Sequence, residues 1–204
     1  MRYQSSVMKF TDISDNENSE ILNDPLQGQL RGHRPENYSG SLFQVALIEP
    51  EIPQNTGNIG RTCVGTRAQL HLVGKLGFEI TDRNLKRAGL DYWQHLWWQH
   101  HSTFAEWENQ LKDPRRVFYF STKGDRYYDE VEYQVGDCMV FGKETKGLPE
   151  DVLRRNPGQV LKIPLLGPIR SLNVATAATV VLYEAIRQLK SRNELDFELK
   201  KISI

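Results

Sequence analysis

Short apolar runs alternate with segments of helical periodicity from Leu42 onward, and this alternation restricts the fold more than any other feature. Strand-like runs occupy residues 42–48, 70–74, 116–122, 138–142 and 159–165. Between or after them, helical patterns cover 55–66, where a loop runs into the helix, and 102–112, 148–155 and 171–190. Strands separated by helices predict an α/β domain with a mainly parallel sheet flanked by helices.

The first 41 residues differ from the rest of the chain. They are polar, lack periodicity and offer too little apolar surface to offset the entropy of ordering. We therefore expect a mostly disordered N-terminal extension over 1–41 and one folded domain over 42–204. A chain of 204 residues with 39% hydrophobic residues is long enough for one sizeable core and short for two.

Composition narrows the class of protein. No run approaches the ~18 apolar residues of a membrane span, and the start lacks a signal-peptide core, so we expect a cytoplasmic protein without a membrane partner. Cys63 and Cys138 have no metal-like spacing and indicate free thiols. The formal net charge of zero argues against an indiscriminate nucleic-acid surface, so a nucleic acid must be met by local clusters such as Lys143/Lys146 and Arg154/Arg155.

The stretch EPEIPQNTGNIGRTC, residues 49–63, stands where a strand leads into a helix. Its glycines could let backbone N–H groups approach an anion at the start of the helix. The spacing fits neither a Walker A loop nor the dinucleotide fingerprint, which weakens a nucleotide hydrolase. The plainer alternative is that Asn55 or Thr56 caps the helix and Arg61 lies on a solvated face.

Two further stretches set polar residues directly after apolar runs. FGKETKGLP, residues 141–149, could be functional or an ordinary strand-to-helix turn with a solvated Glu144. IPLLGPIRSLNVATAATVVLYEA, residues 163–185, places Ser171 and Asn173 at the start of a helix that is apolar on most of its circumference. Such a helix must be buried on several sides, which the sheet and a second subunit could provide.

Aromatic and histidine residues crowd the stretch DYWQHLWWQHH, residues 91–101. Its tryptophans could stack on unpaired bases, but core and interface packing is the favoured interpretation of Trp93, Trp97 and Trp98. No acid or cysteine stands at zinc-like spacing from the histidines His95, His100 and His101. We therefore predict no metal site.

Together with LKRAGLDYWQHL, these stretches resemble the SPOUT superfamily of RNA methyltransferases, and most closely its TrmL type, the tRNA (cytidine/uridine-34)-2′-O-methyltransferases. The resemblance runs from residue 43 to 189 and rests on three motifs in the right order. It implies a SPOUT-type fold with a C-terminal trefoil knot, S-adenosylmethionine as cofactor and a homodimer with active sites at the interface. The implied reaction methylates the ribose 2′-hydroxyl of RNA, with wobble nucleotide 34 of tRNA as the expected target.

The resemblance also assigns residues by motif position. The catalytic candidates are Asn55, Arg61, Glu144, Ser171 and Asn173. The cofactor-binding candidates are Phe120, Gly142, Ile163, Ser171 and Leu172. Tyr183 is expected to contact the dimer partner or the RNA. The chain departs from the family pattern at Gly60, Lys143 and Leu172, which leaves substrate choice open.

Arg61 offers two roles in such a reaction. Because its pKa lies above about 12, it is a poor base unless a phosphate draws off its charge, so we expect it to clamp the phosphate or the 2′-oxygen first. Glu144 is expected to orient Arg61 or the helix ends. Two alternatives remain: an RNA-binding or assembly protein without catalytic activity, and a 2′-O-methyltransferase that acts on another tRNA or rRNA position.

Overall fold

The structure, a computed structural model, describes residues 22–23, 30–31, 40–80 and 92–195. The described strands form one sheet in the order β1-β2-β5-β4-β3-β8-β6-β9-β7. The strand bounds are β1 Leu22–Asn23, β2 Leu30–Arg31, β3 Phe43–Ile48, β4 Ala68–Val73, β5 Trp98–His101, β6 Val117–Phe120, β7 Arg126–Tyr127, β8 Cys138–Phe141 and β9 Val160–Lys162. Among the described strands, only the pairs β1–β2 and β2–β5 are antiparallel, which confirms the mainly parallel sheet.

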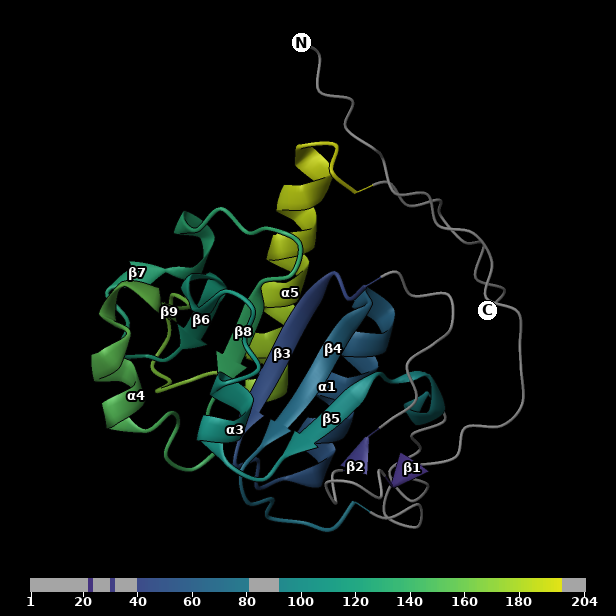
Figure 1. The fold of residues 1–204 in the computed structure, drawn as a ribbon. Coiled ribbons are helices and arrows are strands. Elements are labelled where there is room, and N and C mark those ends of the chain that lie inside the picture. Colours follow the sequence, from purple (N-terminus) through teal and green to yellow (C-terminus); the bar gives the residue numbers. More distant parts are fainter. Residues whose placement is uncertain (1–21, 24–29, 32–39, 81–91, 196–204) are drawn as a thin grey trace.

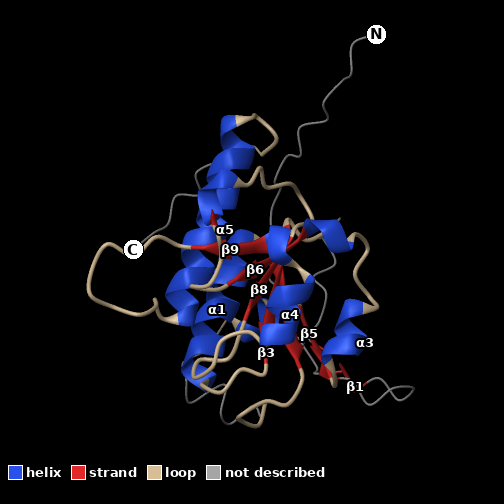
Figure 2. Ribbon diagram, turned by 90° about the vertical axis from the view of Figure 1, so that its left-hand side faces the viewer, coloured by secondary structure: helices blue, strands red, loops and turns tan. Residues whose placement is uncertain are grey.

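Helices cover both faces of the sheet (Figures 1 and 2). One face carries the two long helices α1, Pro53–Thr66, and α5, Val174–Ser191; the short helices α3, Phe104–Glu108, and α4, Glu150–Arg155, pack on the other. Single 3-10 turns are η1 Trp93–His95, η2 Pro114–Arg116, η3 Tyr128–Glu130 and η4 Pro157–Gln159.

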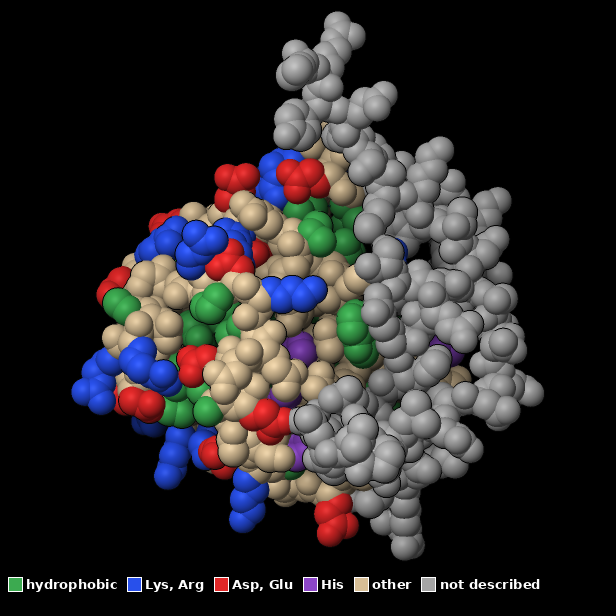
Figure 3. Space-filling view, viewed as in Figure 1, with side chains coloured by type: hydrophobic (Ala, Val, Ile, Leu, Met, Phe, Trp, Pro, Cys, Tyr) green, Lys and Arg blue, Asp and Glu red, His purple; other side chains and the backbone are tan. Residues whose placement is uncertain are grey.

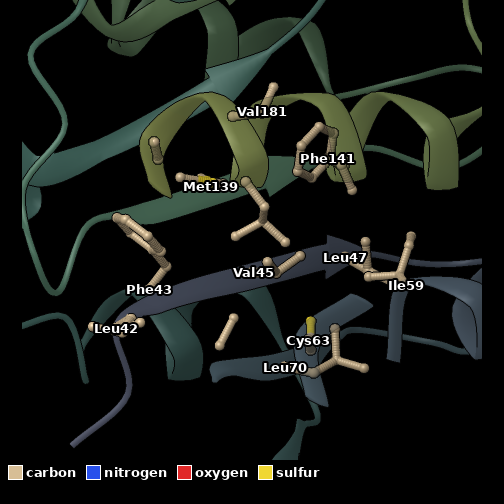
Figure 4. Close-up of a cluster of buried hydrophobic side chains, with 14 of the residues drawn as sticks. Leu42, Phe43, Val45, Leu47, Ile59, Cys63, Leu70, Met139, Phe141 and Val181 are labelled. Carbon is tan, nitrogen blue, oxygen red and sulfur yellow. The ribbon is translucent and has the colours of Figure 1, made fainter. Parts of the chain in front are cut away.

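The larger core lies between the sheet and the two long helices. Figure 4 shows Val45, Met139 and Phe141 of the central strands in one cluster of buried side chains with Val181 of α5. Along α5, Ala178, Val181, Leu182 and Ala185 are fully buried, as expected for an apolar helix. Burial of each Val or Leu side chain stabilises the fold by roughly 1.5–3 kcal/mol, so this helix is anchored mainly by its packing.

A second core lies on the opposite face. Trp107 of α3 and Val152 of α4 pack against Ala46 and Val140 of the central strands. These strands are therefore buried on both sides. This explains why β8 is a continuous apolar run and β3 is apolar except at Gln44, rather than alternating.

Several helix starts differ from the sequence predictions. Helix α1 begins at Pro53, whose ring favours the first helical position, so Asn55 lies inside the first turn and does not cap the helix. Helix α5 begins at Val174, with Asn173 as its cap and Ser171 in the preceding loop. Helix α3 begins at Phe104, two residues after the predicted start, and is capped by the hydroxyl of Thr103, which accepts from the N–H of Glu106.

The stretch 91–101 contains a strand that the sequence did not predict. Trp98 begins β5 and is 1% exposed, and Trp93 is also buried, which confirms their place in the core. Trp97 is only half-buried. The aromatic residues of this stretch indicated packing in the core but did not indicate a strand.

The predicted N-terminal extension lies mostly outside the described residues. Its described parts, β1 and β2, add two short strands at the β5 edge, where Arg31 pairs with Gln99. The boundary at residue 41 and the C-terminal trefoil knot stay predictions. Of the described helices, none combines the length and apolar character that a membrane crossing requires.

Candidate functional site

Three loops meet beyond the carboxyl ends of the parallel strands and enclose a cavity of about 560 Å³. They are the segments that follow β3, β8 and β9, and residues 121–123 after β6 complete the lining. Ligands in open α/β sheets bind at this edge. The cavity lining includes eight of the predicted site residues: Asn55, Phe120, Gly142, Glu144, Ile163, Ser171, Leu172 and Asn173.

The carboxylate of Glu144 binds the start of α1. Its Oε2 accepts from the backbone N–H of Glu51 at 2.8 Å, and its Oε1 accepts from the N–H of Ile52 at 3.3 Å. The same Oε1 accepts from Nδ2 of Asn55 at 2.9 Å. Of the two roles expected for Glu144, the contacts support orientation of a helix end.

Asn55 and Asn173 continue this network to the second long helix. Nδ2 of Asn173 donates to Oδ1 of Asn55 at 2.9 Å. Oδ1 of Asn173 accepts from the N–H groups of Ala175 and Thr176, at 2.9 and 3.3 Å, and so caps α5. Asn55 is only 8% exposed, and these two hydrogen bonds satisfy both polar atoms of its side chain inside the protein. The network connects residues 118 positions apart.

The residues beside Glu144 fasten the same two loops together. Lys143 forms an ion pair with Glu49, and the hydroxyl of Thr145 donates to Glu51 at 2.8 Å. The Thr145 hydroxyl and N–H lower the pKa of the Glu51 carboxyl. Glu49 itself has a φ of 47°, a left-handed conformation that is uncommon for a residue with a side chain. The loops after β3 and β8 thus form one joined wall of the cavity.

Gly142 is required by a close approach of two backbones. A Cβ atom at this position would lie 2.0 Å from the carbonyl carbon of Gly147 and 2.2 Å from the nitrogen of Leu148. The loop folds back on itself here, with the N–H of Gly147 donating to the carbonyl of Lys143 at 2.8 Å. Any side chain would therefore push this wall of the cavity apart.

The inner part of the cavity is apolar. Phe120 and Phe141 stack with ring centroids 4.9 Å apart, and Leu161 and Ile163 line the cavity beside them. The outer part carries exposed cations, among them Arg170, which stands directly before Ser171. The resemblance assigned no role to Arg170. A cavity with an apolar floor and a few polar groups suits a small organic ligand.

Two predicted site residues, Arg61 and Tyr183, do not line this cavity. Arg61 lies further along α1, where it is exposed and its Cζ stands 4.7 Å from the ring centroid of Tyr92. Tyr183 is 55% exposed on α5. The two helices pack together, with the hydroxyls of Thr62 and Thr179 3.0 Å apart.

Histidines form a buried pair elsewhere in the sheet. Nδ1 of His71 lies 2.9 Å from Nε2 of His101, and Nε2 of His71 lies 3.1 Å from Oε1 of Gln44. Burial, and then the proximity of His101, lower the pKa of His71 to about 3. No local pattern indicated this pair, because His71 and His101 stand in separate strands, β4 and β5. Within the described part of the chain, no three His, Cys, Asp or Glu side chains are grouped to hold a metal ion.

Cys63 and Cys138 are both buried, and both are free thiols, as predicted. Burial raises the pKa of each thiol well above its ordinary value. Buried neutral thiols of this kind are unreactive, so neither is a candidate nucleophile.

Comparisons with known proteins agree with this geometry. The profile of the SpoU rRNA methylase family matches residues 42–183. A protein of Saccharophagus degradans named tRNA (cytidine(34)-2′-O)-methyltransferase is 48% identical over 151 residues, which cover 72% of this chain and 96% of the relative. An Escherichia coli protein of the same name is 44% identical over 152 residues, covering 72% of this chain and 94% of the relative.

A solved structure described as giving insights into the 2-OH methylation of C/U34 on tRNA aligns with a TM-score of 0.68 and 48% identity, covering 74% of this chain and 97% of the other. An AdoMet-bound rRNA methyltransferase from Sinorhizobium meliloti aligns with a TM-score of 0.63 and 28% identity, covering 74% and 57%. The match therefore spans the domain that contains the cavity and all three motif loops. The chain belongs to the SpoU rRNA methylase family.

Proposed function

We propose that the protein transfers a methyl group from S-adenosylmethionine to the ribose 2′-hydroxyl of nucleotide 34 of tRNA. The observation that carries this proposal is the convergence of the three motif loops on one cavity, where Asn55, Glu144 and Asn173 are connected by hydrogen bonds. The names of relatives that are 44–48% identical support tRNA and position 34. We also propose a cytoplasmic location, which agrees with a tRNA substrate and with the free thiols of Cys63 and Cys138.

The cavity fits the cofactor in size and in chemistry. Its volume of about 560 Å³ falls within the range of small-molecule sites, and Phe120 and Ile163 offer an apolar surface to an adenine ring. The loop at Gly142 and the segment with Ser171 and Leu172 offer backbone groups for the polar parts. Bound S-adenosylmethionine supplies an electrophilic methyl group on its sulfonium, and a 2′-hydroxyl as acceptor distinguishes RNA from DNA.

Exposed cations surround the cavity and would meet the RNA backbone. Lys146 and Arg170 line its outer part, and Figure 3 shows further Lys and Arg side chains, with Asp and Glu among them, over the region of α4, β7 and β9. Exposed Arg154 and Arg155 belong to this region. Contacts of such cations with phosphates position an RNA without reading its sequence.

Arg61 enters the proposed reaction from a second subunit. It stands outside the cavity of its own chain, on the exposed side of α1, and Tyr183 is exposed on the neighbouring α5. A homodimer formed through these helices would bring a guanidinium to the ribose of the other subunit. There Arg61 would clamp the phosphate or the 2′-oxygen as negative charge develops.

Transfer of labelled methyl from S-adenosylmethionine to purified tRNA tests the proposal. The expected product carries one 2′-O-methyl group, at nucleotide 34, located by nuclease digestion and mass spectrometry. Calorimetric titration with S-adenosylmethionine measures cofactor binding separately. If the protein does not bind S-adenosylmethionine, an RNA-binding or assembly protein without catalytic activity is favoured. Label at another tRNA position or in rRNA would support 2′-O-methyl transfer but would contradict nucleotide 34 of tRNA as the target.

A further inference from the structure

The start of α1 receives its negative charge from a distant loop. Helix α1 has no side-chain cap at Ile52 and no acidic residue in its first turn. The carboxylate of Glu144, 93 residues beyond Glu51, binds the two N–H groups that immediately precede the helix. A carboxylate at this point is also stabilised by the helix dipole.

The direction of every hydrogen bond in the network follows from its two ends, the backbone N–H groups at the start of α5 and the carboxylate of Glu144. The N–H groups of Ala175 and Thr176 can only donate, so the oxygen of the Asn173 amide must face them. Its NH₂ group must then donate to the oxygen of Asn55. The NH₂ group of Asn55 is left to face Glu144, which accepts it. The start of α5 therefore fixes the Asn173 amide, and Asn173 and Glu144 together fix the Asn55 amide.

We infer that Glu144 is a positioning residue, which holds Asn55 in the orientation that receives the Asn173 amide and does not take the proton of the 2′-hydroxyl. This inference rests on the proposed function, since it assigns a role within the same site. A carboxylate offers about four acceptor positions. Donors from Glu51, Ile52 and Asn55 occupy three of them around Glu144.

A glutamine at this position separates the two roles. Its carbonyl oxygen can still accept from Asn55 and Ile52, while its NH₂ group faces the N–H of Glu51 and loses that one bond. A glutamine cannot act as a general base, so a proton-accepting role predicts that Glu144→Gln is as inactive as Glu144→Ala. A positioning role predicts that the glutamine variant is largely active.

Single-turnover methylation of tRNA by the full chain measures this difference. We expect Glu144→Gln to keep the single-turnover rate constant within about tenfold of the unmodified protein with an unchanged pH profile, and Glu144→Ala to lose about a hundredfold or more. Asp151→Asn is the matched control, since it makes the same change on exposed α4 outside the cavity lining. A glutamine variant that is as slow as the alanine variant and has lost the acidic limb of its profile would overturn the inference.

Thermal unfolding tests the same contact without any methyl transfer. Because Asn55 depends on Glu144 for its orientation, the losses in Tm from Asn55→Ala and Glu144→Ala should overlap, and the double variant should lose clearly less than their sum. Additive losses would contradict the inference. If the unmodified chain methylates no RNA, the proposed function fails, while this cycle still decides whether the two residues act as a unit.

Discussion

Arg61 and Tyr92 form a cation–π pair on the outer side of α1, with the guanidinium carbon 4.7 Å from the ring centroid. The Tyr92 hydroxyl donates to the carbonyl oxygen of Gly57 at 2.5 Å, which ties the ring to the same helix. The pair therefore holds the guanidinium against α1, away from the cavity that contains Asn55. Tyr92 belongs to the stretch RAGLDYW, of which only Tyr92 and Trp93 lie within the described residues.

Replacement of Arg61 by alanine should separate cofactor binding from catalysis. Because Arg61 does not line the cavity, we expect Arg61→Ala to leave the Kd for S-adenosylmethionine and the Tm near those of the unmodified protein. Methylation should fall by about 10²–10³-fold, the usual loss when one group that stabilises the developing negative charge is removed. Calorimetry and initial rates measure the two effects. Undiminished turnover would remove Arg61 from the mechanism.

Replacement of Gly142 by alanine should damage the cavity wall. The added methyl group would stand 2.0 Å from the backbone of Gly147, which has no flexible side chain to move aside. We expect the free energy of unfolding to fall by roughly 3 kcal/mol, at the upper end for overpacking, and binding of S-adenosylmethionine to weaken. Denaturant titration and calorimetry measure both.

Gly65→Ala is the control for this change. Gly65 lies in α1, is exposed, and has open space around the position of a Cβ atom. Alanine there should leave the stability equal or raise it by up to about 1 kcal/mol. Equal behaviour of the two variants would contradict the steric account of the loop.

The buried histidine pair should make stability depend on pH. His71 has a pKa near 3 in the folded protein and an ordinary value of 6.5, so between these values the unfolded chain binds more protons. Stability must then fall as pH drops through this window, by up to about 1.4 kcal/mol per pH unit for this residue. Denaturant titrations of His71→Gln at several pH values should show a shallower slope of stability against pH than those of the unmodified protein. An unchanged slope in the His71 variant would contradict this.

Removal of residues 1–40 should leave the proposed dimer intact. The exposed side chains through which we propose dimerisation, Arg61 and Tyr183, lie on α1 and α5, outside the deleted part. We expect sedimentation to give a dimer for both the full and the shortened chain. A monomer after truncation would place the interface in the N-terminal extension, and a monomeric full chain would refute the dimer itself.

The sequence predicted the elements whose patterns are strong and local. Mainly apolar runs indicated the central strands β3, β6 and β8, because strands buried on both faces have few polar positions. The strand β5 was missed because the residues WQHH mix polar and aromatic types. Its pairing with β4 depends on tertiary contacts that no local pattern records.

For the site, the sequence predicted most of the residues but not the contacts between them. The resemblance brought together residues that lie in the cavity, although Ser171 proved to precede its helix. It could not give the contact between Glu144 and Asn55, which are 89 residues apart and meet only through the order of the strands. Nor could it place Arg61 on the outer side of α1, because helix direction depends on where Pro53 begins the first turn.

Comparison of total RNA from cells with and without the gene tests the central claim most directly. Ribose methylation is mapped at each tRNA position by resistance to alkaline cleavage and by mass spectrometry. We predict loss of the 2′-O-methyl group at nucleotide 34 of particular tRNAs, with restoration by the intact gene and not by Arg61→Ala. Unchanged methylation at position 34 in every tRNA would contradict the proposed function.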